Sequence, residues 1–336
     1  MPLLRADDNG LWCEAGGFHI DPWKPVDRAV ITHAHPDHAR PGSARYLCVR
    51  ESEPLLRLQF GSECAIESLE YGVPLFIGDV SVSFHPAGHI LGSAQIRIDH
   101  RGEVWVVSGD YKRAADPTCA PFQPIRCHTF LTESTFGLPI YRWPQTGDVF
   151  AAIDDWWKAN HDRGKCSVLF GDPLGALQRI LAGVDATIGP IVCHEAVEPI
   201  NRIYCASGVA LADTLPEADV RGGFDWTRAL VLAPPWARSA LWMKRFGSVS
   251  TGLASGWMRI RGTRRRNSID RGFVLSDHAD WPGLLATIAD SEAETVLVTH
   301  GYRSPLVRWL RESERNADLI DTRYEGERPD EMTVKS

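Results

Sequence analysis

The alternation of apolar and polar residues changes style along the chain. Up to about residue 146, short apolar or alternating runs end at glycine, proline, aspartate or polar clusters, which is typical of short strands. Two longer segments repeat aliphatic residues, joined by tryptophans in the second, at three- and four-residue spacing, which predicts helices over Glu51–Phe60 and Gln145–His161. The strands predicted in this part are Arg28–Thr32, Val80–His85, Ala94–Asp99, Val104–Ser108 and Thr129–Thr132.

From Ser167 the pattern changes to alternating strands and helices, which indicates βαβ units. The predicted order is SVLF at 167–170, a helix over Ala176–Gly183, PIVCH at 190–194 and a helix over Val197–Ser207. The early style resumes at Gly272, with strands FVLS at 273–276 and TVLVTH at 295–300 and a helix over Pro305–Glu314. We therefore predict one domain, residues 1–146 and 271–336, interrupted by another at 147–270.

Composition narrows the class of protein. The 336 residues contain no apolar run near the ~18 residues that a membrane span needs. The first residues lack the basic and apolar segments of a secretory signal, so we expect no membrane contact and a cytoplasmic location. The eight cysteines form no C-x-x-C pair, which favours reduced thiols over a disulfide framework or a cysteine zinc site.

The charge balance opposes binding of a polyanion over the whole surface, because the net charge is −7. One basic segment stands against this balance, and its arginines could grip phosphates in a local groove. The alternative is a solvated loop, since Gly262, Thr263 and Asn267 break any regular pattern. The arginines are Arg259, Arg261, Arg264, Arg265 and Arg266.

The strongest chemical signal is T-H-A-H-P-D-H at 32–38, directly after the predicted strand RAVIT. Three imidazoles and a carboxylate within six residues suit zinc and related divalent ions. At the end of a strand, a tight turn can direct His33 and His35 at one point and Asp37 and His38 at another. The spacing itself therefore predicts two adjacent metal sites.

Two further ligand candidates follow at strand ends. His89 lies in HPAGHILGSAQ, where Gly88 and Gly92 permit a sharp loop between two strands. Asp110 lies in VWVVSGDYK, where an apolar strand runs into a Gly-Asp turn. A carboxylate at this position has two oxygens and could bridge two cations. Taken alone, each residue would be a structural histidine or a turn aspartate.

These motifs resemble those of known proteins. H-x-H-x-D-H, the later G-H and the G-D after a strand resemble the metallo-β-lactamase superfamily. LTESTFG with Glu133, VLSDHAD with His278 and VLVTHGY with His300 resemble motifs A, B and C of its β-CASP nucleases. Nearly end to end, through stretches such as SFHPAGHILGSAQ, the chain is similar to the bacterial ligase-associated DNA exonucleases. The resemblance implies an α/β fold: a metallo-β-lactamase αββα sandwich with an inserted β-CASP α/β domain.

The resemblance also implies a ligand set and a mechanism. Two zinc ions, with manganese as the alternative, would share a hydroxide that attacks the phosphodiester. Glu133 would hold His278 protonated so that His278 acts as general acid, while Asp21 would orient the ligand loop and Ser276 would contact the phosphate. The first metal would be bound by His33, His35, His89 and Asp110. The second would be bound by Asp37, His38, Asp110 and His300, and Asp37 is also counted among the catalytic residues.

The implied activity is exonucleolytic hydrolysis of DNA in repair, beside an ATP-dependent DNA ligase and a helicase. RNA stays open as the substrate, because a histidine in motif C is also common in the RNA-processing branch. A small-molecule hydrolase of the same fold would explain the metal motif but neither Glu133 nor His278. A non-catalytic subunit would be expected to lack metal ligands. One departure is Ala176, which stands where related proteins usually carry a lysine, so a phosphate contact there is in doubt.

Overall fold

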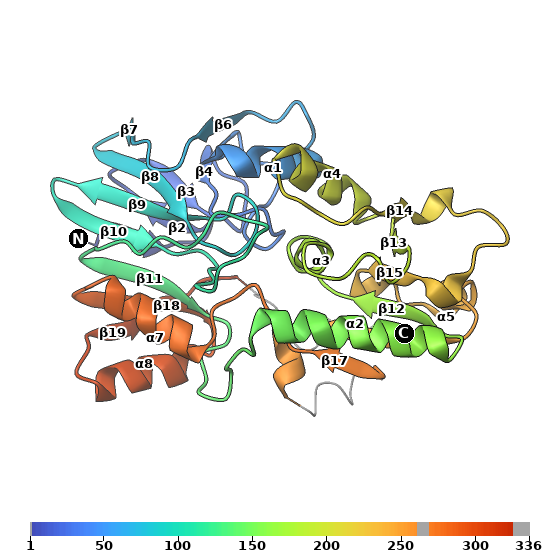
Figure 1. The fold of residues 1–336 in the computed structure, drawn as a ribbon. Coiled ribbons are helices and arrows are strands. Elements are labelled where there is room, and N and C mark those ends of the chain that lie inside the picture. The colour runs from blue at the N-terminus through green and yellow to red at the C-terminus, as the bar shows by residue number, and fades with distance from the viewer. Residues whose placement is uncertain (1, 261–268, 325–336) are drawn as a thin grey trace. The chain divides into compact units, whose positions relative to one another are not determined.

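Three β-sheets organise the chain, and their strands are separated by helices and loops (Figure 1). The computed structural model describes residues 2–260 and 269–324. These residues divide into two units, one with residues 2–142 and 278–324 and the other with residues 143–277. The predicted mixed α/β fold is confirmed. None of the described helices has the length and apolarity needed to cross a lipid bilayer.

The first unit contains two sheets. One has the order β1-β2-β3-β4-β5-β6, and the other has the order β19-β18-β11-β10-β9-β8-β7. The strands of the first sheet are β1 (Leu4–Ala6), β2 (Leu11–Cys13), β3 (Phe18–Ile20), β4 (Arg28–Val30), β5 (Arg45–Val49) and β6 (Ile66–Leu69). The strands of the second are β7 (Leu75–Ile77), β8 (Val80–Pro86), β9 (Ala94–His100), β10 (Glu103–Val107), β11 (Thr129–Ser134), β18 (Thr295–Gly301) and β19 (Ala317–Leu319).

The two sheets of this unit share one apolar core. Buried side chains from both, such as Phe18 and Val30 of the first and Phe84 and Ile96 of the second, belong to a single cluster. The other face of the second sheet packs against α7 (Trp281–Asp290) and α8 (Arg303–Glu312), which lie beside β18 in Figure 1. Helix α1 (Glu53–Phe60) follows a short 3-10 turn, Arg50–Ser52, after β5. Loops that contain His33 and Asp110 follow β4 and β10, and β18 itself contains His300.

The second unit is built on a parallel sheet with the order β14-β13-β15-β12-β16-β17. Helix α2 buries Val149, Ile153 and Trp157 at helical spacing against this sheet, as its pattern predicted. The strands are β12 (Cys166–Phe170), β13 (Ile191–Cys193), β14 (Leu215–Pro216), β15 (Leu230–Ala233), β16 (Val249–Ala254) and β17 (Arg271–Phe273). The helices are α2 (Thr146–Asp162), α3 (Ala176–Leu181), α4 (Glu198–Ala206) and α5 (Ala240–Lys244), with 3-10 turns at Glu217–Asp219, Trp226–Arg228, Pro235–Ala237 and Gly256–Arg259.

The strand predicted over 273–276 is wrong beyond Phe273. β17 pairs with β16 only over Arg271–Phe273, and then the chain leaves the sheet. The N–H of Leu275 donates to the carbonyl of Phe273, and the carbonyl of Ser276 accepts from the guanidinium of Arg179. The segment is apolar because Leu275 is buried in the core of this unit, not because the segment continues a ladder.

Candidate metal centre

The loop after β4 presents the histidine cluster as the sequence predicted. The N–H groups of His38 and Ala39 both donate to the carbonyl of His35, at 3.0 and 2.8 Å, so the chain turns sharply there. His33 and His38 are buried, whereas His35 is partly exposed. The turn therefore places three imidazoles within one small volume, and the ring centroids of His33 and His38 are 4.2 Å apart.

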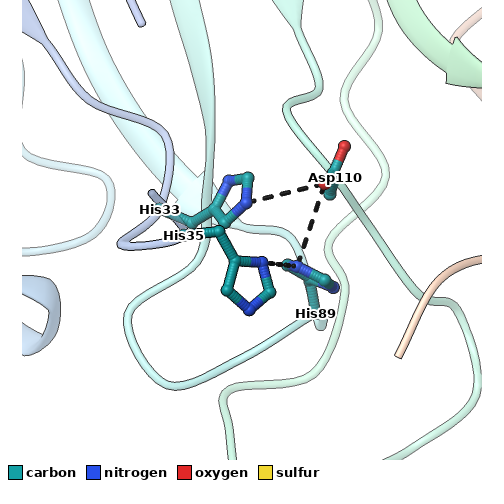
Figure 2. A group of neighbouring side chains, drawn as sticks. All are labelled: His33, His35, His89 and Asp110. Carbon is teal, nitrogen blue, oxygen red and sulfur yellow. Dashed lines mark hydrogen bonds and ion pairs between the residues drawn. The ribbon is translucent and has the colours of Figure 1, made fainter. Parts of the chain in front are cut away.

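A first group consists of His33, His35, His89 and Asp110, and one ligand atom of each lies within 4.8 Å of the others. Figure 2 shows the four side chains directed toward one another. Nε2 of His33 is 3.6 Å and Nε2 of His89 is 4.0 Å from Oδ2 of Asp110. Nε2 of His89 is 3.0 Å from Nδ1 of His35. The structure thus brings together the set that the resemblance implied for the first metal.

Glycines allow the supporting loops to approach closely. Gly88, just before His89, has φ +73, and a Cβ there would lie 2.3 Å from the carbonyl oxygen of Lys112. Gly109, just before Asp110, has φ +56, and a Cβ there would lie 2.7 Å from Cβ of Thr32. Because any larger residue would clash at both positions, these glycines let three separate loops converge.

A second group consists of His38, Asp110 and His300. Nε2 of His300 is 2.9 Å from Oδ1 of Asp110, and Nε2 of His38 is 3.6 Å from Oδ2. Asp110 therefore belongs to both groups, since its Oδ2 faces His33, His89 and His38 while its Oδ1 faces His300. Asp37 lies at the margin of this group, with Oδ2 3.7 Å from Nε2 of His38 and with its side chain partly exposed.

Hydrogen bonds determine which ring nitrogens face these groups. Nδ1 of His38 donates to Oδ2 of Asp21 at 2.8 Å, since a carboxylate can only accept. The Thr32 hydroxyl donates to the same oxygen at 2.5 Å, so it must accept from Nδ1 of His33 at 3.0 Å. The Thr299 hydroxyl donates to the carbonyl of Thr132 and accepts from Nδ1 of His300 at 2.7 Å. Each ring therefore directs Nε2 toward Asp110.

Unpaired nitrogens indicate that these residues fit a metal. Nε2 of His33 and Nε2 of His38 are buried and have no hydrogen-bond partner among the described residues. An unpaired buried polar atom costs about 1–3 kcal/mol, so such atoms are rare unless an ion or water serves them. Imidazole nitrogens around a shared carboxylate are a donor set suited to zinc. Zinc-binding histidines also typically hydrogen-bond through their other nitrogen, as these rings do to Asp21 and Thr32.

The electrostatics of the metal-free protein favour a cation at this place. Burial opposes protonation of His38, yet Asp110, Asp37 and Asp21 outweigh it and raise the pKa of His38 to about 10. Burial would raise the pKa of Asp110, but His38 and His300 hold it well below its usual range. Burial and the neighbouring His38 lower the pKa of His33. Without a metal, a proton on His38 therefore supplies the positive charge that the carboxylates attract.

Glu133 and His278 form a buried pair beside the first group, and ligand atoms of the pair and of Asp110 lie within 4.8 Å of one another. Nδ1 of His278 lies 3.0 and 3.2 Å from the two oxygens of Glu133, which also accept from the N–H groups of Tyr111 and Thr135 at 2.9 and 3.3 Å. The His278 ring centroid is 4.7 Å from that of His89. The carboxylate therefore holds Nδ1 and fixes the orientation of the ring beside the first group.

The remaining predicted contact residues belong to the second unit or lie outside the described residues. Ser276 is buried and belongs to the other unit, and its carbonyl serves Arg179. Arg259 is exposed at the end of a 3-10 turn, while Arg261, Arg264, Arg265 and Arg266 lie outside the described residues.

Tyr324 is a neighbour of the second group that the sequence reasoning missed. Its ring stacks on His38, with centroids 4.5 Å apart. Burial and the nearby Asp21 raise the pKa of its hydroxyl well above the usual value, so the phenol stays neutral. A lone tyrosine near the end of a charged segment gives no pattern that could have identified it.

The chain is similar in sequence to several known proteins. No protein-family model matches the chain. Over 93% of its length the chain is 30% identical to a protein of Opitutus terrae named "Probable DNA ligase", of which it covers 30%. It is 26% identical over 207 residues to a transcription termination factor of Methanosarcina mazei, and 32% identical over 147 residues to a ribonuclease of Thermus thermophilus. The match to the Opitutus terrae protein is the longest of these three, at 321 residues.

The chain matches only part of each relative. The second and third relatives match 50% and 36% of the chain, and the chain covers 32% and 34% of them. The chain therefore spans about a third of the length of each of these three curated relatives. A solved structure of a protein of unknown function from Enterococcus faecalis has a TM-score of 0.58 at 13% identity, covering 89% of this chain and 80% of that one. This last likeness concerns the fold alone.

Proposed function

We propose that the chain is a metal-dependent phosphodiesterase that cleaves nucleic acid, with a metal pair held by seven side chains. The observation that carries this proposal is the buried carboxylate of Asp110, which is shared by two adjacent groups of ligands: its Oδ2 faces His33, His89 and His38, and its Oδ1 faces His300. Zinc is the proposed metal because imidazoles dominate the donor set. The first ion would be held by His33, His35, His89 and Asp110, and the second by Asp37, His38, Asp110 and His300.

When bound, such a metal pair supplies an activated water and neutralises charge on the phosphate. The protein's own residues supply positioning and a proton. Asp21 accepts from both His38 and Thr32 and so orients two parts of the ligand loop. The carboxylate of Glu133 faces Nδ1 of His278 and favours its charged form, so that Nε2 can protonate the leaving oxygen.

DNA is the proposed substrate, in an exonucleolytic repair reaction beside an ATP-dependent DNA ligase and a helicase. The support is the match to a protein named as a DNA ligase, which extends over 93% of the chain. We further propose that residues 147–270 form the inserted β-CASP domain. Phosphates would be contacted by Ser276, Arg259, Arg261, Arg264, Arg265 and Arg266. RNA is a candidate because two relatives are named as a ribonuclease and an endoribonuclease. It comes second because these relatives match only 36% and 32% of the chain.

The test uses end-labelled single- and double-stranded DNA and RNA of one sequence, incubated with metal-free protein and increasing zinc or manganese. We expect a ladder of shortened DNA that appears only with metal and is absent for His35→Ala, which removes a ligand of the first group. Preferential shortening of RNA would replace DNA by the second candidate. Tightly bound zinc without hydrolysis of any nucleic acid would refute the proposal and favour a non-catalytic protein.

A further inference from the structure

Tyr324 lies beyond β19 and is buried in the core between the two sheets of the first unit. Its side chain is 8% exposed. The ring contacts Trp23 edge-on, with centroids 5.9 Å apart, and the hydroxyl donates to the carbonyl of Ile20 at 3.2 Å. These contacts anchor the ring to β3 and to the segment that follows it.

The same ring contacts two ligands of the second group. It stacks on His38, with centroids 4.5 Å apart and ring planes 17° apart. It meets His300 edge-on, with centroids 5.6 Å apart and planes at 83°. The hydroxyl points to Ile20, the residue before Asp21, which itself binds Nδ1 of His38. Tyr324 therefore supports His38 directly and also supports the strand end that orients it.

This support matters because a metal must lie in the plane of the imidazole that binds it. The bond from His38 to Asp21 holds one ring atom but leaves the ring free to tilt about that atom. A face-to-face contact limits that tilt. The rings of His33 and His300 also contact the His38 ring, at 41° and 66°, but of these three neighbours Tyr324 alone lies nearly parallel to it.

We infer that Tyr324 is a positioning residue for the second metal group, where its ring sets the planes of His38 and His300. The inference rests on the proposed function, because it presupposes a second ion. Loss of the ring is expected to lower the affinity for the second ion about 10–100-fold, the usual effect of removing a residue that orients a metal ligand. The affinity of the first group should stay unchanged.

The experiment compares Tyr324→Leu and Tyr324→Phe with the wild-type protein. Bound zinc per chain is measured by elemental analysis, and the affinity of each ion by competition with a chromogenic chelator. Tyr324→Leu should keep one tightly bound ion and lose the second at limiting zinc. Tyr324→Phe keeps the ring and should retain both. If Tyr324→Leu does not fold, Tyr324→Met removes the ring in a second way.

Trp105→Leu is the matched control, because Trp105 is a buried aromatic residue of the same core cluster and belongs to none of the candidate metal groups. It should lower the unfolding temperature and leave both zinc affinities unchanged. Equal zinc loss in Trp105→Leu and Tyr324→Leu would overturn the inference, as would unchanged second-ion affinity in Tyr324→Leu or full loss in Tyr324→Phe. Fewer than two zinc ions in the wild-type protein would instead contradict the proposed function.

Discussion

Replacing Asp21 by asparagine tests how the ligand loop is oriented. Asp21 is 1% exposed and has φ +41, a conformation that asparagine tolerates better than most residues. Its Oδ1 accepts from the N–H of Thr32 at 2.8 Å, and its Oδ2 accepts from the Thr32 hydroxyl and from Nδ1 of His38. The Asp21→Asn variant would therefore keep the backbone and the volume but would offer only one accepting oxygen.

Both orientations of the new amide are unfavourable. If its NH₂ faces the N–H of Thr32, two buried donors meet, which costs about 1–3 kcal/mol. If its NH₂ faces His38, Nδ1 of that ring must accept, and its proton moves to Nε2, the atom directed at the second group. The second arrangement blocks the ligand nitrogen and also removes the oxygen to which the Thr32 hydroxyl donates. We expect metal affinity to fall about 10–100-fold, or about 1.4–2.7 kcal/mol, whichever orientation dominates.

The assay is a chelator competition for zinc, with urea unfolding of the metal-free protein alongside. Asp7→Asn is the matched control, because Asp7 also accepts from two backbone N–H groups and contacts a histidine, His19, at 3.1 Å. Neither Asp7 nor His19 belongs to a candidate metal group, so zinc affinity should not change in the Asp7→Asn variant. Wild-type zinc affinity in Asp21→Asn would refute the orienting role.

Two further predictions concern the acid and the competing proton. The His278→Ala variant should keep both zinc ions but turn over about 10²–10⁴-fold more slowly, as expected for loss of a general acid. Elemental analysis measures the bound zinc, and single-turnover assays measure the rate. Full activity of this variant would remove His278 from the role of general acid. Zinc affinity should rise with pH, because zinc must displace the proton of His38, whose pKa is raised to about 10. The raised pKa of His38 also stabilises the metal-free protein at pH values below the ordinary pKa of histidine, and this stabilisation is lost as the pH rises toward about 10. If neither zinc affinity nor unfolding free energy changes with pH over this range, both predictions are wrong.

The ligand loop was predictable because its residues are adjacent in sequence. His33, His35 and His38 follow a strand at a spacing that leaves little choice of chemistry. His89 and Asp110 became convincing only beside that cluster, since a single histidine or aspartate in a glycine turn has many structural explanations. Tyr324 could not be found this way, because its role depends on a fold that brings the end of the described chain onto His38.

The fold was less evident than the loop. β15 (LVLA) and β16 (VSTGLA) were not predicted, because nearly all of their residues are buried and neither strand shows the alternation of apolar and polar residues that identifies half-exposed strands. The error at 274–276 has the related cause that burial, rather than strand pairing, explains the apolar residues. α7 was missed as well: Pro282 lies in its first turn, where proline is compatible with a helix.

The first unit is completed only by residues that follow the second unit in the chain. Every ligand of the first group precedes Arg142, whereas His300 and Tyr324 come after residue 277. Under the proposed function, a nascent chain could therefore bind the first ion before the second unit has emerged from the ribosome, whereas the second ion requires the residues after 277. Because the entropy of closing a loop grows only with the logarithm of its length, the intervening unit delays this closure far more than it opposes it.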